Sequence, residues 1–123
     1  MSAPNIVNVA TITGKTAQVA VGTSATQILE NPASSGKVFK VNVLMITNID
    51  NTNAADITVN LYPQDDVGGT GVAIASTISV PADAVLVLIE KNTSLYLEED
   101  KSLGGIASAS GDLIATISYE EIS

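Results

Sequence analysis

Two clusters of carboxylates are the residues best suited to chemistry in this chain. Asp65 and Asp66 lie in a glycine-rich stretch, and the run Glu98-Glu99-Asp100 follows an apolar segment. Carboxylate oxygens are ligands that Ca²⁺ accepts, so either cluster could bind a hard cation. Acidic residues in loops also serve as plain surface charge, and we adopt that interpretation, with no metal site and no cofactor predicted.

A calcium-binding loop and a catalytic centre are both excluded by missing residues. The segment 50–61 is superficially similar to a calcium loop, but it lacks the central glycine and carries Leu61 where a bidentate glutamate is needed. The chain has no histidine and no cysteine, which removes the usual general base, the Ser-His and Cys-His pairs and ordinary zinc sites. Residues 68–71, Gly-Gly-Thr-Gly, lack the lysine of a phosphate loop. The sequence predicts a protein that is not an enzyme.

Composition and charge exclude further classes of function. Thirteen acidic residues face five lysines, which gives a formal charge of −8, and such a surface repels a nucleic-acid backbone. The N-terminal residues lack the basic and apolar regions of a signal peptide, and the longest apolar stretch, 84–89, is too short to span a bilayer. We therefore expect a soluble protein with no nucleic-acid or membrane partner.

The elements that must position these residues are all predicted to be strands. The core must be built from Val, Ile, Leu and Ala, since the chain has three Tyr, one Phe and no Trp, and β-branched residues favour strands. About nine short strands are expected from ten candidate segments, with a turn at residues 13–15 and a hairpin at Ser110-Gly111. Their ranges are 5–12, 16–21, 26–30, 37–48, 56–62, 72–80, 85–89, 94–98, 102–109 and 112–119. This spacing predicts an all-β, single-domain antiparallel β-sandwich, jelly-roll or immunoglobulin-like, with a barrel as the second choice.

The segment 37–48 carries the strongest strand pattern and the predicted contact surface. Phe39 and Val41 begin an alternating apolar face that runs on to residues 43 and 45, while Leu44 and Ile46 make the opposite face apolar as well. We predict that Leu44 and Ile46 form a self-association or capsid-contact surface, with Phe39 and Tyr119 as core or interface residues. On this interpretation Leu44→Asp leaves a folded monomer.

The chain divides in composition near residue 36. Residues 37–123 are assigned to the sandwich core, and residues 1–36 either form its first strands or an arm that pairs with a neighbour by β-augmentation. A glycan site would need an exposed aromatic platform, and its candidates are Phe39, Tyr62, Tyr96 and Tyr119.

Several short motifs from about residue 37 onward carry a resemblance. They are GKVFKV at 36–41, TNID at 47–50, ADITV at 55–59, SVPAD at 79–83, LYLEE at 95–99 and SYEEI at 118–122. Together they resemble small β-sandwich virion structural proteins of tailed phages, of the cyanophage type. The resemblance implies a capsid decoration, or cement, protein that binds the major capsid protein or another virion protein, forms a homo-oligomer and resides in the virion after synthesis in the host cytoplasm. A neck, tail or fibre component, or a glycan- or calcium-dependent binding module, remains an alternative.

Overall fold

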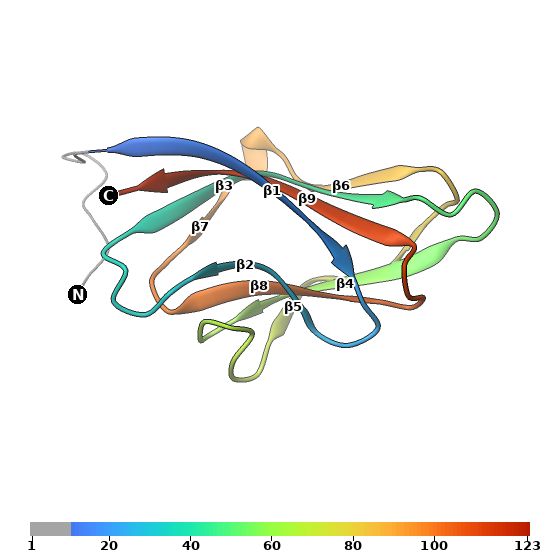
Figure 1. The fold of residues 1–123 in the computed structure, drawn as a ribbon, viewed down its shortest axis with the longest axis horizontal. Coiled ribbons are helices and arrows are strands. Elements are labelled where there is room, and N and C mark those ends of the chain that lie inside the picture. Colours follow the sequence, from blue (N-terminus) through green and yellow to red (C-terminus); the bar gives the residue numbers. More distant parts are fainter. Residues whose placement is uncertain (1–10) are drawn as a thin grey trace.

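The computed structural model describes residues 11–123, which fold into two packed antiparallel sheets (Figure 1). The nine strands and one short 3₁₀ helix are β1 (Ile12–Val21), β2 (Thr26–Asn31), β3 (Val38–Asn48), β4 (Ala55–Tyr62), β5 (Val72–Val80), β6 (Val85–Ile89), η1 (Lys91–Thr93), β7 (Leu95–Leu97), β8 (Lys101–Ala107) and β9 (Leu113–Ile122). The predicted all-β sandwich is confirmed.

The strand order shows why the chain makes a sandwich. One sheet, here called sheet A, has the order β1-β9-β3-β6, with β7 pairing to β3 beyond the end of β6. The other, sheet B, has the order β2-β8-β4-β5. Among strands that follow one another in the described part of the chain, only β4 and β5 pair directly. The other connections pass between sheets or along one edge, so distant segments are held together.

The core lies between the two sheets and is made almost wholly of aliphatic side chains. Fully buried positions include Leu44 and Ile46 from sheet A and Ile57, Val59 and Leu103 from sheet B. Inward residues alternate with outward ones over most of β4 and over the first half of β9, as in a half-buried sheet. The small aromatic content therefore suffices, because branched aliphatic side chains fill the narrow space between the layers.

Two buried asparagines fasten the loops at opposite ends of β3. The Asn48 side chain donates to the carbonyl oxygens of Asn53 (3.0 Å) and Val80 (2.9 Å) and accepts from the Asp50 amide (2.9 Å). The Asn31 side chain donates to the carbonyl oxygens of Lys37 and Leu97. Buried polar groups persist where all their hydrogen bonds are made, and each asparagine here ties three chain segments together.

Two predicted connections are wrong. Residues 13–15 do not form a turn, because Gly14 pairs with Glu120 inside a continuous strand that is hydrogen-bonded to β9 along its full length. Ser110-Gly111 does not close a hairpin, since it joins β8 in sheet B to β9 in sheet A. Both predictions were based on residues that favour turns locally, whereas pairing with strands distant in the sequence decided the structure.

The first two strands of the described chain belong to different sheets. β1 forms one edge of sheet A through its pairing with β9, and β2 forms one edge of sheet B through its pairing with β8. Between residues 12 and 31 the structure thus has paired strands of the sandwich. The predicted strand at residues 5–12 lies outside the described residues except for its last two positions.

Candidate interaction surface

The predicted contact residues Leu44 and Ile46 are buried in the core, so assigning them to a surface was wrong. Both side chains are fully inaccessible. The cause is a β-bulge: the register of β3 against β9 shifts between Val41 and Val43. A bulge inserts one residue and changes which positions face inward. Odd residues point inward before Asn42 and even residues after it, so the apparent second apolar face is the same core face continued.

Phe39 and Tyr119 pack against each other at the end of the core. Phe39 is buried, Tyr119 is half-buried, and their ring centroids lie 5.3 Å apart with the planes tilted by 36°. This is a stabilising aromatic pair. Tyr62 is also buried, so Tyr96, which is 44% exposed, is the one aromatic side chain of the four that presents itself to solvent. No pair of rings is available as a glycan platform.

Carboxylates of the two acidic clusters hold loops in place by accepting hydrogen bonds from main-chain amides. Asp65 Oδ2 accepts from the Ala33 amide, and Asp100 Oδ1 accepts from the Asp65 amide, both at 3.1 Å. Glu99 Oε2 accepts from the Gly36 amide at 3.1 Å. Each carboxylate thus uses an oxygen to satisfy a main-chain donor, which gives these charges a structural role. Within residues 11–123 no group of three or more acidic, His or Cys side chains is arranged to hold a metal ion.

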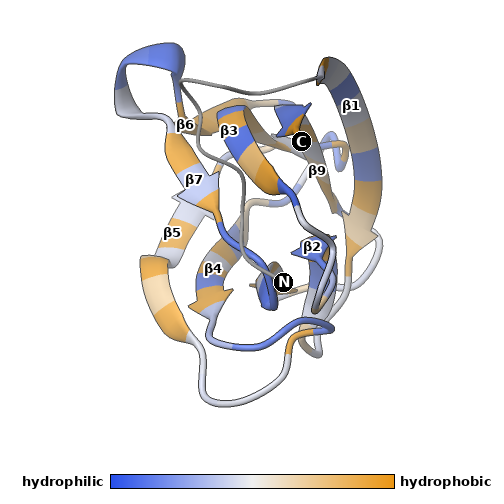
Figure 2. Cartoon of the chain, turned by 90° about the vertical axis from the view of Figure 1, so that its left-hand side faces the viewer, coloured by the Kyte–Doolittle hydropathy of each residue, from blue (hydrophilic) through white to orange (hydrophobic). Residues whose placement is uncertain are grey.

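Most large apolar side chains left exposed lie along one side of the sandwich. This side is formed by β5, β6 and β7, opposite the side formed by β1 (Figure 2). Its exposed members among the described residues are Val72, Ile74, Val85, Val87 and Tyr96. Ile12 on β1 and Ile49 in the loop after β3 are not among them. We call this side, defined by these strands, the β5–β7 side. Concentration of exposed apolar side chains in one region is typical of interaction surfaces.

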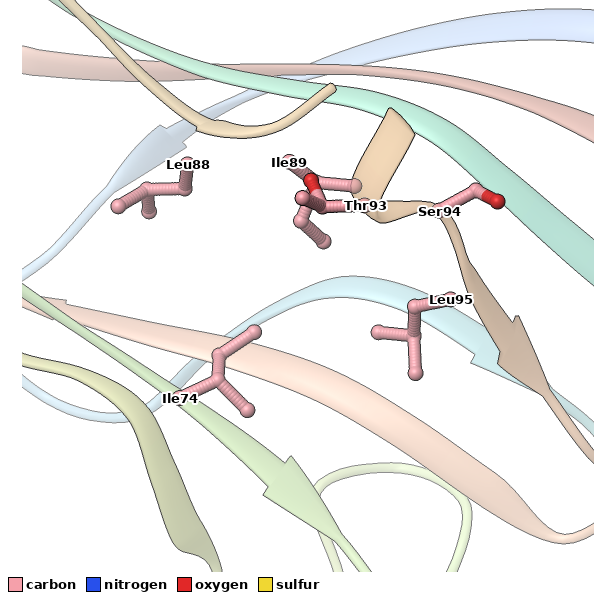
Figure 3. Close-up of a pocket in the computed structure, with 6 residues that line it drawn as sticks. All are labelled: Ile74, Leu88, Ile89, Thr93, Ser94 and Leu95. Carbon is pink, nitrogen blue, oxygen red and sulfur yellow. The ribbon is translucent and has the colours of Figure 1, made fainter. Parts of the chain in front are cut away.

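A groove opens on the β5–β7 side between the two sheets. It has a volume of about 350 Å³ and is lined by Ile74, Leu88, Ile89, Thr93, Ser94 and Leu95. Ile74 lies on one wall, and Leu88, Ile89 and Thr93 lie on the other (Figure 3). The lining offers two hydroxyl groups and no charged group, so it suits an apolar contact and lacks the groups for acid–base chemistry.

The outer face of sheet A is uncharged over much of its area. Residues paired across strands point to the same face, and the register joins four rows of outward side chains. These are Thr16, Gln18 and Ala20 of β1, Ile114, Thr116 and Ser118 of β9, Val43, Met45 and Thr47 of β3, and Val85 and Val87 of β6. We call them the neutral face. Charged side chains lie beyond both ends of the β9 row, where Glu120 accepts from Asn42 Nδ2 at 3.1 Å and Asp112 precedes Ile114.

The apolar stretch Val85–Ile89 was the feature of the sequence that indicated an exposed apolar surface. This stretch is apolar at every position, whereas a strand with one solvated face alternates. We interpreted it as a short strand and as too short to span a bilayer, and the described residues contain no helix long and apolar enough to cross a membrane. The same stretch is an edge strand with two of its five side chains exposed.

Comparisons with known proteins identify no family. The sequence matches no protein-family model, and no curated protein matches it. A solved structure with a similar arrangement comes from work on Bacillus endospore appendages, which form a novel family of disulfide-linked pili. That protein is 15% identical, the match covers 91% of this chain and 87% of that chain, and the TM-score is 0.48. A likeness at this level carries no argument about function.

Proposed function

We propose that this chain is a non-enzymatic structural protein, and specifically a capsid decoration protein of a tailed phage that binds the major capsid protein. The observation that carries the proposal is the neutral face. In a molecule with a formal charge of −8, none of the eleven side chains of the neutral face, which come from four adjacent strands, carries a charge. A protein that must lie flat on a large partner needs such a surface, because desolvating charges opposes docking.

The remainder of the molecule suits the same role. The acidic residues lie outside the neutral face, where they keep a protein made in many copies soluble. The motifs at 36–41, 55–59 and 118–122 that resemble virion proteins of tailed phages support the choice of a phage shell as the partner.

Quantitative stoichiometry of purified particles tests the proposal. A ratio near one copy per capsid subunit, or one per few subunits, is expected for a protein that covers the shell. A ring of subunits would give about a dozen copies per particle, and that result would indicate a neck or tail role in place of shell decoration. Absence from the particle would overturn the virion role and favour a binding module elsewhere.

A pair of variants connects the surface to the function. Thr116→Glu places a charge in the middle of the neutral face, and we expect the folded variant to lose binding to particles. Ala73→Glu adds the same charge at an exposed position of β5 in the other sheet and should bind as the natural protein does. Equal binding by both variants would show that the neutral face is not the docking surface.

A further inference from the structure

Two large apolar side chains are buried on the outer face of sheet A, away from the core. Phe39 belongs to the core cluster, so its neighbour Val38 points to the opposite face of β3, because successive side chains of a strand alternate. Ile122 lies opposite Val38 in the register of β3 with β9 and shares its face. Both are only 5% exposed, yet neither belongs to the core cluster of the described residues. Buried apolar side chains outside the main core are typical of a small cluster beneath a crossing segment.

The chain enters sheet A beside this pair. Thr11 and Ser123 exchange both main-chain hydrogen bonds, at 3.0 Å and 2.9 Å, so the residues before Thr11 start next to the end of β9. Neighbouring strands are about 4.8 Å apart, which puts Ile122 on β9 about 5 Å and Val38 on β3 about 10 Å from β1 across the sheet. Five residues of extended chain span about 16 Å, so they are enough to cross both strands.

The residues before Thr11 have the composition and the spacing that this apolar pair requires. None of residues 1–10 carries a charge, in a chain with thirteen acidic residues and five lysines. Val9 and Val7 precede Thr11 by two and four positions, so in an extended segment they share one face and come about 7 Å and about 13 Å from it. That spacing matches one side chain on each of the two strands beyond β1.

We infer that residues 6–9 form a strap across the end of sheet A, in which Val9 covers Ile122 and Val7 covers Val38 of the same chain. The chain's own segment is favoured over that of a second copy because its tether beside the pair gives it an effective concentration on the order of millimolar. The strap places an uncharged segment on the same face of the sheet as the neutral face. The inference stands on the buried pair and does not depend on a phage shell as the partner.

Spin labelling of the full chain tests the strap. The natural sequence has no cysteine, so Lys40→Cys introduces a single labelling position on the outer face of sheet A, two residues along β3 from Val38. A nitroxide at this position should broaden the amide NMR signals of residues 6–9. Ser76→Cys, at an exposed position of β5 in sheet B, is the matched control and should leave the same signals sharp.

Three outcomes would overturn the inference. Sharp signals for residues 6–9 with the label at position 40 would mean that other side chains cover the buried pair. Equal broadening by both labels would mean that the segment has no fixed place on sheet A. Broadening in a mixture of spin-labelled chains and separate isotope-enriched chains without the label would mean that the segment of a second copy is the occupant.

The pairing of Val9 with Ile122 has its own test. Val9→Ala should raise the equilibrium constant for unfolding about three- to tenfold, as for truncation of a largely buried valine, and Asn8→Ala in the same segment should change it less than about twofold. In an Ile122→Ala background Val9→Ala should lose most of its effect, because the side chain that it contacts is gone. Ile122→Val serves the same purpose should Ile122→Ala fold poorly. An undiminished effect of Val9→Ala in that background would contradict the pairing.

Discussion

Single side chains with complete hydrogen bonding hold the ends of this sandwich in place. Asn48 is the clearest case, because it is buried and its amide nitrogen faces two carbonyl oxygens. Only a hydrogen-bond donor fits next to these two carbonyl oxygens. The identity of the residue at 48 therefore depends on Asn53 in the loop that follows β3 and on Val80 at the end of β5, which is 32 residues away.

Asn48→Asp is expected to be strongly destabilising although the two side chains have the same shape. A carboxylate would direct an oxygen at the carbonyl oxygens of Asn53 and Val80, and it would also bury a charge. We expect a loss of about 3 kcal/mol or more in the free energy of unfolding at pH 7, measured by urea denaturation. Part of the loss should be recovered at low pH, where the carboxyl group can donate. A loss below about 1 kcal/mol would mean that Asn48 is not a required donor.

Glu121 gives the molecule an acid-sensitive contact. Its carboxylate accepts from Lys37 Nζ at 2.6 Å and from Lys15 Nζ at 3.0 Å, and these hydrogen bonds, Lys37 first, lower the pKa of Glu121 below its ordinary value of 4.5. A carboxyl group whose pKa is lower in the folded state stabilises the protein above its ordinary pKa. That contribution is lost as the pH falls through the lowered pKa.

Glu121→Gln should remove this part of the pH dependence. We expect less than about 1 kcal/mol at pH 7, since both lysines are partly exposed to solvent, and no difference from the natural protein once Glu121 is protonated. Urea unfolding at pH 7 and at the lowest pH at which the protein stays folded measures the two values. Glu98→Gln, at an exposed residue, is the matched control. An equal difference at both pH values would show that the loss does not come from the ionised carboxylate.

At the scale of elements, one glycine of sheet B allows a loop to cover the outer face of that sheet. A Cβ on Gly104 would lie 2.7 Å from Val67 Cγ1 and 2.8 Å from Tyr62 Cε2. Ser102, two residues earlier on the same strand, accepts from the Val67 amide at 2.9 Å and donates to the Gln64 carbonyl oxygen at 2.8 Å. The glycine-rich, acidic loop that contains Gln64 and Val67 is therefore fastened to β8.

Gly104→Val should detach this loop while the sandwich persists. The added side chain occupies the space of Val67 and the Tyr62 ring, so the loop must move away from β8. We expect increased hydrogen exchange at the Val67 amide and a loss of about 1–3 kcal/mol in stability, as for overpacked sites. Gly111→Ala, where a Cβ meets no neighbour within 4 Å, controls for the loss of a glycine alone, although its φ of 81° adds local strain. Unchanged exchange at Val67 in Gly104→Val would refute the packing role.

At the scale of the molecule, the two sheets depend on the first strands of the chain. β1 and β2 lie in different sheets, and Val21, Ile28 and Leu29 supply buried side chains to the core. Nothing in this arrangement allows residues 37–123 to close the sandwich alone, since both sheets would lose an edge strand.

A fragment of residues 37–123 is accordingly expected not to fold. Removal of β1 exposes β9, and removal of β2 exposes β8, in addition to the loss of core side chains. Circular dichroism and NMR chemical-shift dispersion of the fragment, compared with the full chain, provide the measurement. A fragment with native-like dispersion would mean that the sandwich core is independent of the first strands.

The sequence by itself determined the class of fold and excluded several kinds of chemistry. Period-two alternation and β-branched residues depend only on local backbone geometry, so the strands at 56–62 and 72–80 could be predicted well. The absence of His and Cys is likewise visible without a structure. Only the tertiary structure decided which side chains of a strand face the core and which face outward. The bulge at Asn42 reverses the inward positions of β3, and pairing with β9 keeps Gly14 extended. Both effects arise from partners about 75 to 105 residues away, and a single-strand pattern does not contain that information.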